Sequence, residues 1–202
     1  RDRDYNVAYN SRRKVSDRLG RGGGFLMKKQ NIDVHMGAAK LTEKDTVEGT
    51  PDKGEAETLK AKNIIIATGS HTFTVPGVEL DGEKVVDYEG AILRKELPKS
   101  AVIIGGGAIG VEFATIWNAY GVDVTLVEML DHLLPVEDEA IRKEIEKAYQ
   151  KRGIKIMTQS KVKGVETTEA GTKVTVETGD GEKEVEAGLT LMSIGFRPNS
   201  KG

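Results

Sequence analysis

Cysteine is absent from the 202 residues of the sequence, which excludes disulfide bonds, thiolate metal sites and thiol chemistry within this chain. No apolar run approaches the roughly 20 residues that a membrane-spanning helix requires, and no signal peptide opens the sequence. The formal net charge is only −2, so electrostatics favours neither nucleic acid nor an anionic membrane. We therefore expect no nucleic acid and no membrane among the partners, and a cytoplasmic location by default.

Histidine is also scarce, and its distribution argues against a metal site. The sequence has 3 histidines, His35, His71 and His132, which are scattered and lack the spacing of metal ligands. Ser70 beside His71 does not form the G-x-S-x-G turn of a hydrolase. We therefore expect no bound metal ion and no hydrolase of this type.

Glycine, in contrast, is abundant, and three of the 24 glycines form the pattern G-x-G-x-x-G at Gly105, Gly107 and Gly110. The apolar run Ala101–Ile104 stands directly before them and is typical of a buried parallel strand. In a dinucleotide site the first glycine allows a tight turn and the second lets the backbone approach a pyrophosphate. The third lets helix and strand pack closely. Unpaired N–H groups and the positive end of a helix dipole then suit the phosphates.

A helix and a second strand are predicted after these glycines. Val122–Val127 is the second apolar strand, Glu128 follows it, and Gly121 is typical of a helix end. The apolar side chains at helical spacing before Gly121 are Ile109, Phe113, Ile116, Trp117 and Tyr120. A glycine-rich sequence contains G-x-G-x-x-G by chance, but strand, helix, second strand and acid in this order predict a dinucleotide site.

Glu128 indicates NAD rather than NADP. It lies 23 residues beyond Gly105, near the offset of the acid that binds ribose hydroxyl groups in such sites. A carboxylate at this place repels a 2′-phosphate. The following residues Met129–Asp131 add no cation, and His132 is only a weak candidate. The sequence therefore predicts NAD(H) as the nucleotide.

Two further stretches resemble each other and indicate a duplication. Leu59–His71 and Val185–Arg197 align at an offset of 126 without a gap, which places Gly69 on Gly195. Each contains an apolar strand that ends on a glycine turn, and each follows a polar hairpin region, the later one turning at Gly179–Gly181. Glycine-ended strands are common in α/β proteins, so coincidence is the alternative. The matched order of hairpin and strand favours a duplicated unit.

The expected fold class is α/β: a Rossmann-like parallel sheet with flanking helices and an antiparallel β-hairpin layer, plus part of a second similar domain. The predicted organisation is the rear half of the second domain over 1–75, a linker or crossover over 76–97, a complete dinucleotide-binding domain over 98–199, and a tail over 200–202.

Two more helices are expected on either side of the linker. The first covers Ser11–Lys29, with a flexible break at Arg21–Gly24, because no strand precedes these glycines as a phosphate loop would require. The second is amphipathic, carries Ile141 and Tyr149 on its apolar face, and ends near Lys151.

The sequence resembles the dihydrolipoyl dehydrogenases of the pyridine nucleotide–disulfide oxidoreductase family from about Arg13 to Asn199. The segments that carry the resemblance are LGRGGGFLMKKQNID, LKAKNIIIATGS, LPKSAVIIGGGAIGVEFATIWNAYG, VTLVE and SIGFRPN. Their order and spacing are typical of flavoproteins with two dinucleotide sites. Trp117 and the segment LMKKQ favour dihydrolipoyl dehydrogenase over glutathione and mercuric reductases. By this resemblance, 1–75 belongs to an FAD-type domain.

The resemblance implies an oxidoreductase that passes electrons from dihydrolipoyl groups through a redox disulfide and FAD to NAD⁺. The implied cofactors are NAD and FAD, and the implied partners are lipoyl-bearing proteins. Members of the family form homodimers mainly through a C-terminal domain that this sequence does not match, so a monomer is expected here. The implied NAD-binding residues are Gly105, Gly106, Gly107, Ala108, Ile109, Gly110, Glu128, Val162 and Gly195.

The resemblance also implies residues on the flavin side. These are Gly37, Ala39, Thr68, Gly69 and Ser70. Glu112 has two interpretations. It corresponds to a family glutamate between nicotinamide and flavin, and it is equally explained as a carboxylate near a helix N-terminus, where the dipole stabilises it by about 0.3–1 kcal/mol.

Several family features are missing from the sequence. They are the first G-x-G-x-x-G, which binds FAD, the C-x-x-x-x-C disulfide, the Gly-Asp flavin motif and the His–Glu acid–base pair. We therefore expect an NAD(H)-binding portion that does not turn over lipoamide by itself and binds FAD weakly or not at all. The alternatives are a stand-alone NAD(H)-binding module and a related flavoprotein of the NADH oxidase or ferredoxin reductase type. A flavin absorbance band in the purified protein would favour a flavoenzyme over a module.

Overall fold

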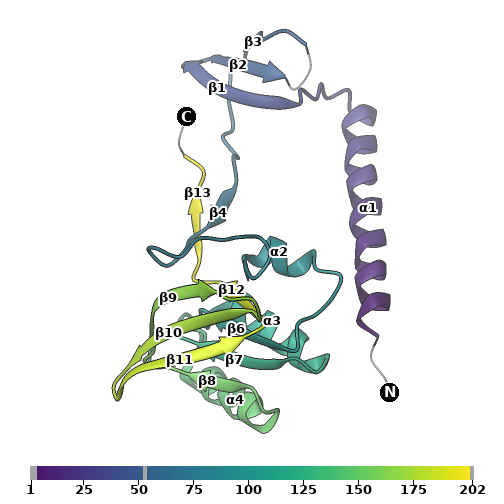
Figure 1. Cartoon of the computed structure of the whole chain (residues 1–202). Helices are drawn as coiled ribbons and strands as arrows, with labels where there is room; N and C mark the ends of the chain where they lie inside the picture. Colours follow the sequence, from purple (N-terminus) through teal and green to yellow (C-terminus); the bar gives the residue numbers. More distant parts are fainter. Residues whose placement is uncertain (1–3, 52–53, 201–202) are drawn as a thin grey trace. The chain divides into compact units, whose positions relative to one another are not determined.

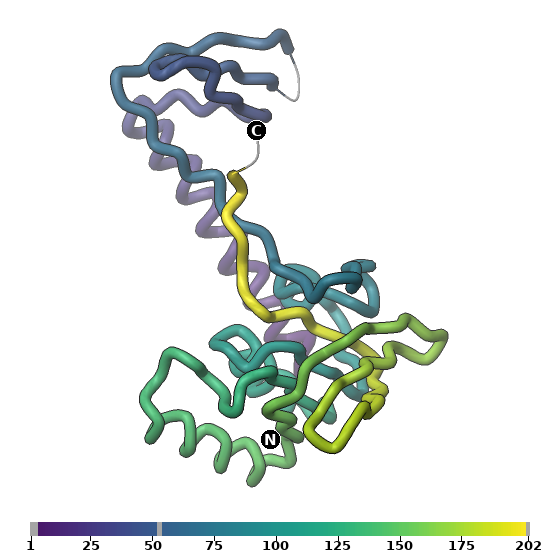
Figure 2. The backbone as a smooth tube through the Cα atoms, turned by 90° about the vertical axis from the view of Figure 1, so that its left-hand side faces the viewer, coloured from purple at the N-terminus to yellow at the C-terminus, as the bar shows by residue number. Residues whose placement is uncertain are grey.

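The computed structural model describes residues 4–51 and 54–200, and close contacts divide the chain into two compact units. Unit 1 consists mainly of Ser70–Arg197 and unit 2 mainly of Val7–Gly69. Figure 1 labels the helices and strands of both units, and Figure 2 follows the backbone from a second side. The segment 76–97, predicted as a linker, lies within unit 1.

A five-stranded sheet forms the centre of unit 1, in the order β5-β12-β6-β7-β8. Every pairing in it is parallel, which confirms the predicted Rossmann-like arrangement. The strands are β5 (Val85–Val86), β6 (Ser100–Ile104), β7 (Asp123–Val127), β8 (Lys155–Met157) and β12 (Leu189–Met192). The helices of the unit are α2 (Tyr88–Ile92), α3 (Ala108–Ala119) and α4 (Glu139–Lys151).

Alternate residues of the parallel strands face two different layers, as the period of a strand requires. Ile103 belongs to a buried cluster that includes Trp117 of α3 and Tyr149 of α4. Its neighbour Val102 belongs to a second buried cluster that includes Val174 of the antiparallel strands. Helices therefore cover one face of the parallel sheet, and an antiparallel sheet covers the other (Figure 1).

The antiparallel layer is a three-stranded sheet of order β11-β10-β9. Its strands are β9 (Lys161–Thr167), β10 (Thr172–Thr178) and β11 (Gly181–Ala187). The predicted hairpin at Gly179–Gly181 is confirmed, because β10 and β11 pair antiparallel from Thr178 and Gly181 onward. Val174 and Val176 of β10 are both fully buried against the parallel sheet.

Unit 2 contains the helix α1 (Tyr5–Lys29) from Val7 onward and a three-stranded antiparallel sheet of β1 (Gly37–Glu43), β2 (Thr46–Pro51) and β3 (Glu57–Lys60). The helix begins before the predicted Ser11, and the break predicted at Arg21–Gly24 is wrong, since α1 runs through this segment without interruption (Figure 2). Glycine lowers helix propensity by about 1 kcal/mol per residue but does not prevent helical backbone angles.

The structure extends the internal repeat beyond the stretches that suggested it. At the same offset of 126, the range of β2 falls on 172–177, within β10, and the range of β3 falls on 183–186, within β11. Thr46 falls on Thr172, and the two threonines are buried at equivalent places at the start of their strands. The correspondence therefore covers the second and third strands of the sheet, while β1 falls on 163–169 and overlaps β9 only in part.

One predicted strand of the repeat does not form. The segment 63–66, which contains the apolar run Ile64–Ile66, corresponds to β12 but is irregular, and Ile65 and Ile66 are 92% and 71% exposed. β12 lies between β5 and β6, which pair with it on both sides. Among the residues that the structure describes, none pairs in this way with 63–66, so its backbone lacks the hydrogen bonds that define a strand.

The final short sheet joins β4 (Ser70–Thr72) to β13 (Phe196–Pro198). Beside it, the backbone N–H of Phe73 donates to the carbonyl oxygen of Gly195 at 2.9 Å. In 4–51 and 54–200, no helix combines the length and the apolar composition needed to cross a bilayer. The cytoplasmic location stays a prediction.

Asp81 fixes the turn before β5. Its carboxylate accepts hydrogen bonds from the backbone N–H groups of Glu83, Lys84 and Val85 at 2.7–2.8 Å and from the hydroxyl of Thr167 in β9 at 3.2 Å. Partial burial acts to raise the pKa of Asp81, but these donors outweigh it and hold the pKa below the ordinary value of 3.8.

The lowered pKa of Asp81 predicts a loss of stability in acid. A carboxyl group with a lowered folded-state pKa stabilises the fold fully above its ordinary value of 3.8, and this contribution is lost as the pH falls through the lower folded value. Asp81→Asn should therefore be less stable than the unaltered chain at pH 7 and should lose less stability on acidification. Urea unfolding at pH 7 and at about pH 3 tests this; parallel pH profiles for the two proteins would contradict it.

Candidate dinucleotide site

A cavity of about 600 Å³ opens in unit 1 at the carboxyl ends of the parallel strands. Its lining includes Ile104 and Gly105 from the end of β6, Glu128 after β7, and Ser193 after β12. Parallel α/β sheets bind ligands in this place because their loops and helix N-termini converge there. The predicted glycine motif and the predicted acid therefore meet at one cavity.

The three glycines of the motif have three different environments. Gly105 has a φ of +108°, and a side chain there would crowd the backbone of Ser193. A side chain at Gly110 would overlap the carbonyl oxygen of Gly105. At Gly107, in contrast, no described residue other than its chain neighbours has an atom within 4 Å of the place that a Cβ would take, and Gly107 lines the cavity. The first and third glycines therefore serve the fold, and the second leaves room for a ligand.

The N-terminus of α3, with its free backbone N–H groups, lies at this open space. Gly107 is the N-cap residue, has extended backbone angles and provides no side-chain cap. Its carbonyl oxygen accepts the N–H of Val111 at 3.0 Å, which closes the first helical turn. Ala108 and Ile109, the first helical residues, line the cavity. The free N–H groups of a first turn and the helix dipole favour an anion at this end.

The backbone fixes the carboxylate of Glu128. One carboxylate oxygen, Oε2, accepts the N–H of Gly106 at 2.6 Å, and Oε1 accepts the N–H of Leu130 at 2.8 Å. A carboxylate accepts about four hydrogen bonds, so capacity remains for hydroxyl groups of a ligand. Because Gly106 belongs to the glycine turn, this bond couples the position of the acid to the turn.

The sequence profile of the family described as "Pyridine nucleotide-disulphide oxidoreductase" matches residues 2–202. The chain belongs to this family. It is a family of enzymes, and the relatives of this chain include proteins named dihydrolipoyl dehydrogenase.

The sequence relatives come from distant organisms. A dihydrolipoyl dehydrogenase of Mycobacterium leprae is 44% identical over 202 residues, which cover 98% of this chain and 43% of that protein. A mitochondrial dihydrolipoyl dehydrogenase of Pisum sativum is 37% identical over 191 residues, which cover 94% of this chain and 38% of that protein. The chain thus spans less than half the length of these two relatives.

Solved structures show the same fold. LpdA from Mycobacterium tuberculosis matches with a TM-score of 0.90 at 24% identity, over 100% of this chain and 45% of that one. RclA from Escherichia coli, a HOCl-induced flavoprotein disulfide reductase, matches with a TM-score of 0.85 at 26% identity, over 99% and 45%. The fold of the disulphide oxidoreductase family is therefore present over the whole chain.

The structure brings most residues of the predicted NAD side together. Val162, at 7% exposure, and Gly195 line the same cavity as the glycine motif and Glu128. Gly106 adjoins it through its bond to Glu128, and Gly110 underlies the turn. Glu112 is exposed on α3 and is absent from the lining, so neither interpretation of this residue is decided.

The predicted flavin side is not assembled into a comparable site by the described residues. Gly37 and Ala39 lie in β1, Ser70 begins β4, and none of them lines the cavity. Thr68 and Gly69 are instead engaged with Asn199. The hydroxyl of Thr68 donates to the carbonyl oxygen of Asn199 at 2.6 Å, and the N–H of Asn199 donates to the carbonyl oxygen of Gly69 at 3.0 Å.

Part of the cavity lining escaped the sequence analysis. Residues that follow β7, β8 and β12 were predictable in principle, because loops at the carboxyl ends of parallel strands form such sites. No sequence pattern predicts the lining residues that come from the segment before β5. The unpredicted lining residues are Phe73, Val75, Pro76, Ile104, Val127, Met129, Leu130, Pro135, Ser160, Lys161, Ser193, Ile194 and Phe196.

Proposed function

We propose that this chain is the NAD(H)-binding portion of a dihydrolipoyl dehydrogenase-type flavoprotein, and that NAD(H) binds in the unit 1 cavity. Two features of one turn carry the proposal. There is open space where a side chain at Gly107 would stand, and the carboxylate of Glu128 is hydrogen-bonded to the N–H of Gly106 in the same turn. The sequence relatives named dihydrolipoyl dehydrogenase support the class of enzyme.

Each part of the cavity has a role in this proposal. The first turn of α3 and the open backbone at Gly107 receive the pyrophosphate. Glu128 accepts hydroxyl groups of the adenosine ribose, and Val162 contacts the adenine. Gly195 stands at the nicotinamide end. NAD(H), when bound, supplies hydride-transfer chemistry, and the residues of this chain bind and orient it.

The wider activity is proposed from the relatives. In it, electrons pass from dihydrolipoyl groups on partner proteins through a disulfide and FAD to NAD⁺. The residues present do not fit FAD in the same way, because the described part of unit 2 has no glycine turn between a parallel strand and a helix. We therefore infer that these 202 residues alone bind NAD(H) as a monomer without oxidising dihydrolipoamide.

Neutralising Glu128 should weaken NADH binding and relax the discrimination against NADPH. Glu128→Ala removes the acceptor of the ribose hydroxyl groups, and Glu128→Gln removes the charge while keeping the size. We expect NADH to bind about tenfold more weakly and the NADPH-to-NADH affinity ratio to rise. Trp117, the single tryptophan, lies on α3, and its fluorescence is followed during the titration.

Glu137→Ala is the matched control. This glutamate is exposed in the loop after β7 and is absent from the cavity lining, so its removal should change neither affinity. Unchanged selectivity in both Glu128 variants would refute the role of this carboxylate. No saturable binding of NADH by the unaltered chain would refute the proposed function itself.

A further inference from the structure

Two charged residues line the unit 1 cavity among those the structure describes: Glu128 and Lys161. The backbone holds them close together. The N–H of Ser160, the residue before Lys161, donates to the carbonyl oxygen of Glu128 at 3.0 Å. The N–H of Gln159 donates to the carbonyl oxygen of Leu130 at 2.7 Å. Lys161 therefore begins β9 beside the acid that the proposed function assigns to the adenosine ribose.

The positive charge of Lys161 is not neutralised by the described residues. Its cross-strand neighbour is Glu177, but the carboxylate of Glu177 binds the ammonium group of Lys163 at 3.4 Å. No described residue forms an ion pair or a hydrogen bond with the Lys161 side chain, which is exposed. His132, the cation that the sequence offered, is paired with Asp131 and is absent from the cavity lining.

We propose that Lys161 is a second determinant of nucleotide selectivity, which attracts the 2′-phosphate of NADP(H) and opposes the repulsion by Glu128. The proposal rests on the proposed binding of NAD(H) in this cavity. A phosphate monoester carries a charge of about −1.5 to −2 at pH 7, so one unpaired ammonium group at the same wall of the cavity acts on NADPH and hardly on NADH. The selectivity of the site is then a balance between an acid and a base, rather than the effect of the acid alone.

This balance makes a prediction that Glu128 alone does not. Lys161→Met keeps an unbranched side chain but removes the charge, and we expect it to weaken NADPH binding by about tenfold while NADH binding stays within about twofold. In the Glu128→Gln background, adding Lys161→Met should cancel most of the gain in NADPH affinity. Because Lys161 is exposed, its effect should shrink as salt rises from about 0.05 to 0.5 M.

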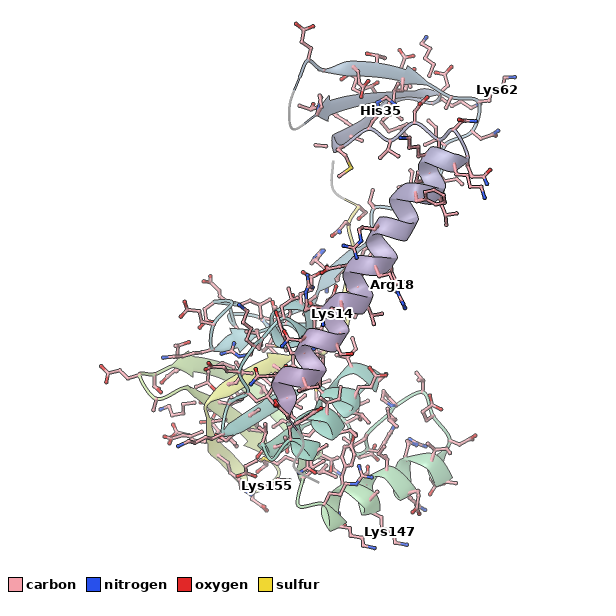
Figure 3. All side chains as sticks on the ribbon, turned by 90° about the vertical axis from the view of Figure 1, so that its right-hand side faces the viewer. Lys14, Arg18, His35, Lys62, Lys147 and Lys155 are labelled. Atoms are coloured by element: carbon pink, nitrogen blue, oxygen red, sulfur yellow. The ribbon has the colours of Figure 1, made fainter. Side chains whose placement is uncertain are left out.

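The experiment titrates the full chain and these variants with NADH and with NADPH at both salt concentrations. Lys147→Met is the matched control, because Lys147 is exposed on α4 of the same unit and is absent from the cavity lining (Figure 3). It removes the same charge, so it should leave the NADPH-to-NADH affinity ratio unchanged. Thermal melting of each variant verifies that the fold is retained.

The outcomes separate this inference from the proposed function. Equal NADPH affinity in Glu128→Gln with and without Lys161→Met would overturn the role of Lys161, and so would an equal loss in Lys147→Met. Saturable NADH binding in those same experiments would still support the proposed function. If the unaltered chain binds neither nucleotide, the proposed function fails and the role of Lys161 fails with it.

Discussion

Replacing Gly107 with valine is expected to abolish NADH binding while leaving the fold intact. The φ of Gly107 is −74°, which any residue adopts, and apart from its chain neighbours no described residue has an atom within 4 Å of the place where a Cβ would stand. The Cβ of valine therefore has room, and the side chain takes up space that we assign to the pyrophosphate. The change also weakens the N-cap of α3, by about 1 kcal/mol. We expect NADH affinity to fall by at least about a hundredfold, or about 2.8 kcal/mol.

The control for Gly107→Val is a glycine outside the cavity that also has open space where a side chain would stand. Gly164 in β9 also has open space in its side-chain direction and is absent from the cavity lining. Gly164→Val should bind NADH normally, since a β-branched residue suits a strand. Titration followed by Trp117 fluorescence and thermal melting are done on both variants. An affinity retained in Gly107→Val would refute the placement of the pyrophosphate, whatever the behaviour of Glu128.

The βαβ unit of the NAD side was predictable because its signals are local. The apolar strand, the glycine spacing, the helical period ending at Gly121 and the second strand before Glu128 all lie within 101–128. The period of a strand or a helix and the turn chemistry of glycine act over a few residues. The structure accordingly forms β6, α3 and β7 close to the predicted bounds.

Other features depend on distant partners, and local patterns did not predict them. Ile65 and Ile66 have the composition of a buried strand, but a strand needs neighbours, and the described residues supply none there. Phe73 reaches the cavity because its N–H pairs with Gly195, far along the chain. No local pattern marks Lys161 as a cation for a phosphate, because it lies 33 residues beyond Glu128 in sequence and beside it only in the fold.

Gly110 should give the opposite result to Gly107: a loss of stability rather than a selective loss of binding. Even the single methyl group of Gly110→Ala would overlap the carbonyl oxygen of Gly105 and would lie 3.0 Å from the hydroxyl oxygen of Ser193. That hydroxyl group shares its one proton between the carbonyl oxygens of Ile104 and Gly105, at 2.9 and 3.1 Å. The backbone of the turn cannot yield without breaking these bonds, so α3 must move away from β6.

Overpacking of this kind costs about 1–3 kcal/mol and occasionally more. Because the methyl group meets backbone at Gly105, we expect the upper part of this range, about 3 kcal/mol, and a fall in the melting temperature of about 6–12 °C. Gly107→Ala is the matched control, since it adds the same methyl group in open space at the same motif. Its weaker N-cap, by about 1 kcal/mol, should lower the melting temperature by only about 2–4 °C. If Gly110→Ala and Gly107→Ala have the same melting temperature, the close contact between α3 and the end of β6 does not fix the conformation of the glycine turn. The loss of binding expected for Gly107→Val would then have to be explained by the turn moving rather than by a blocked pyrophosphate.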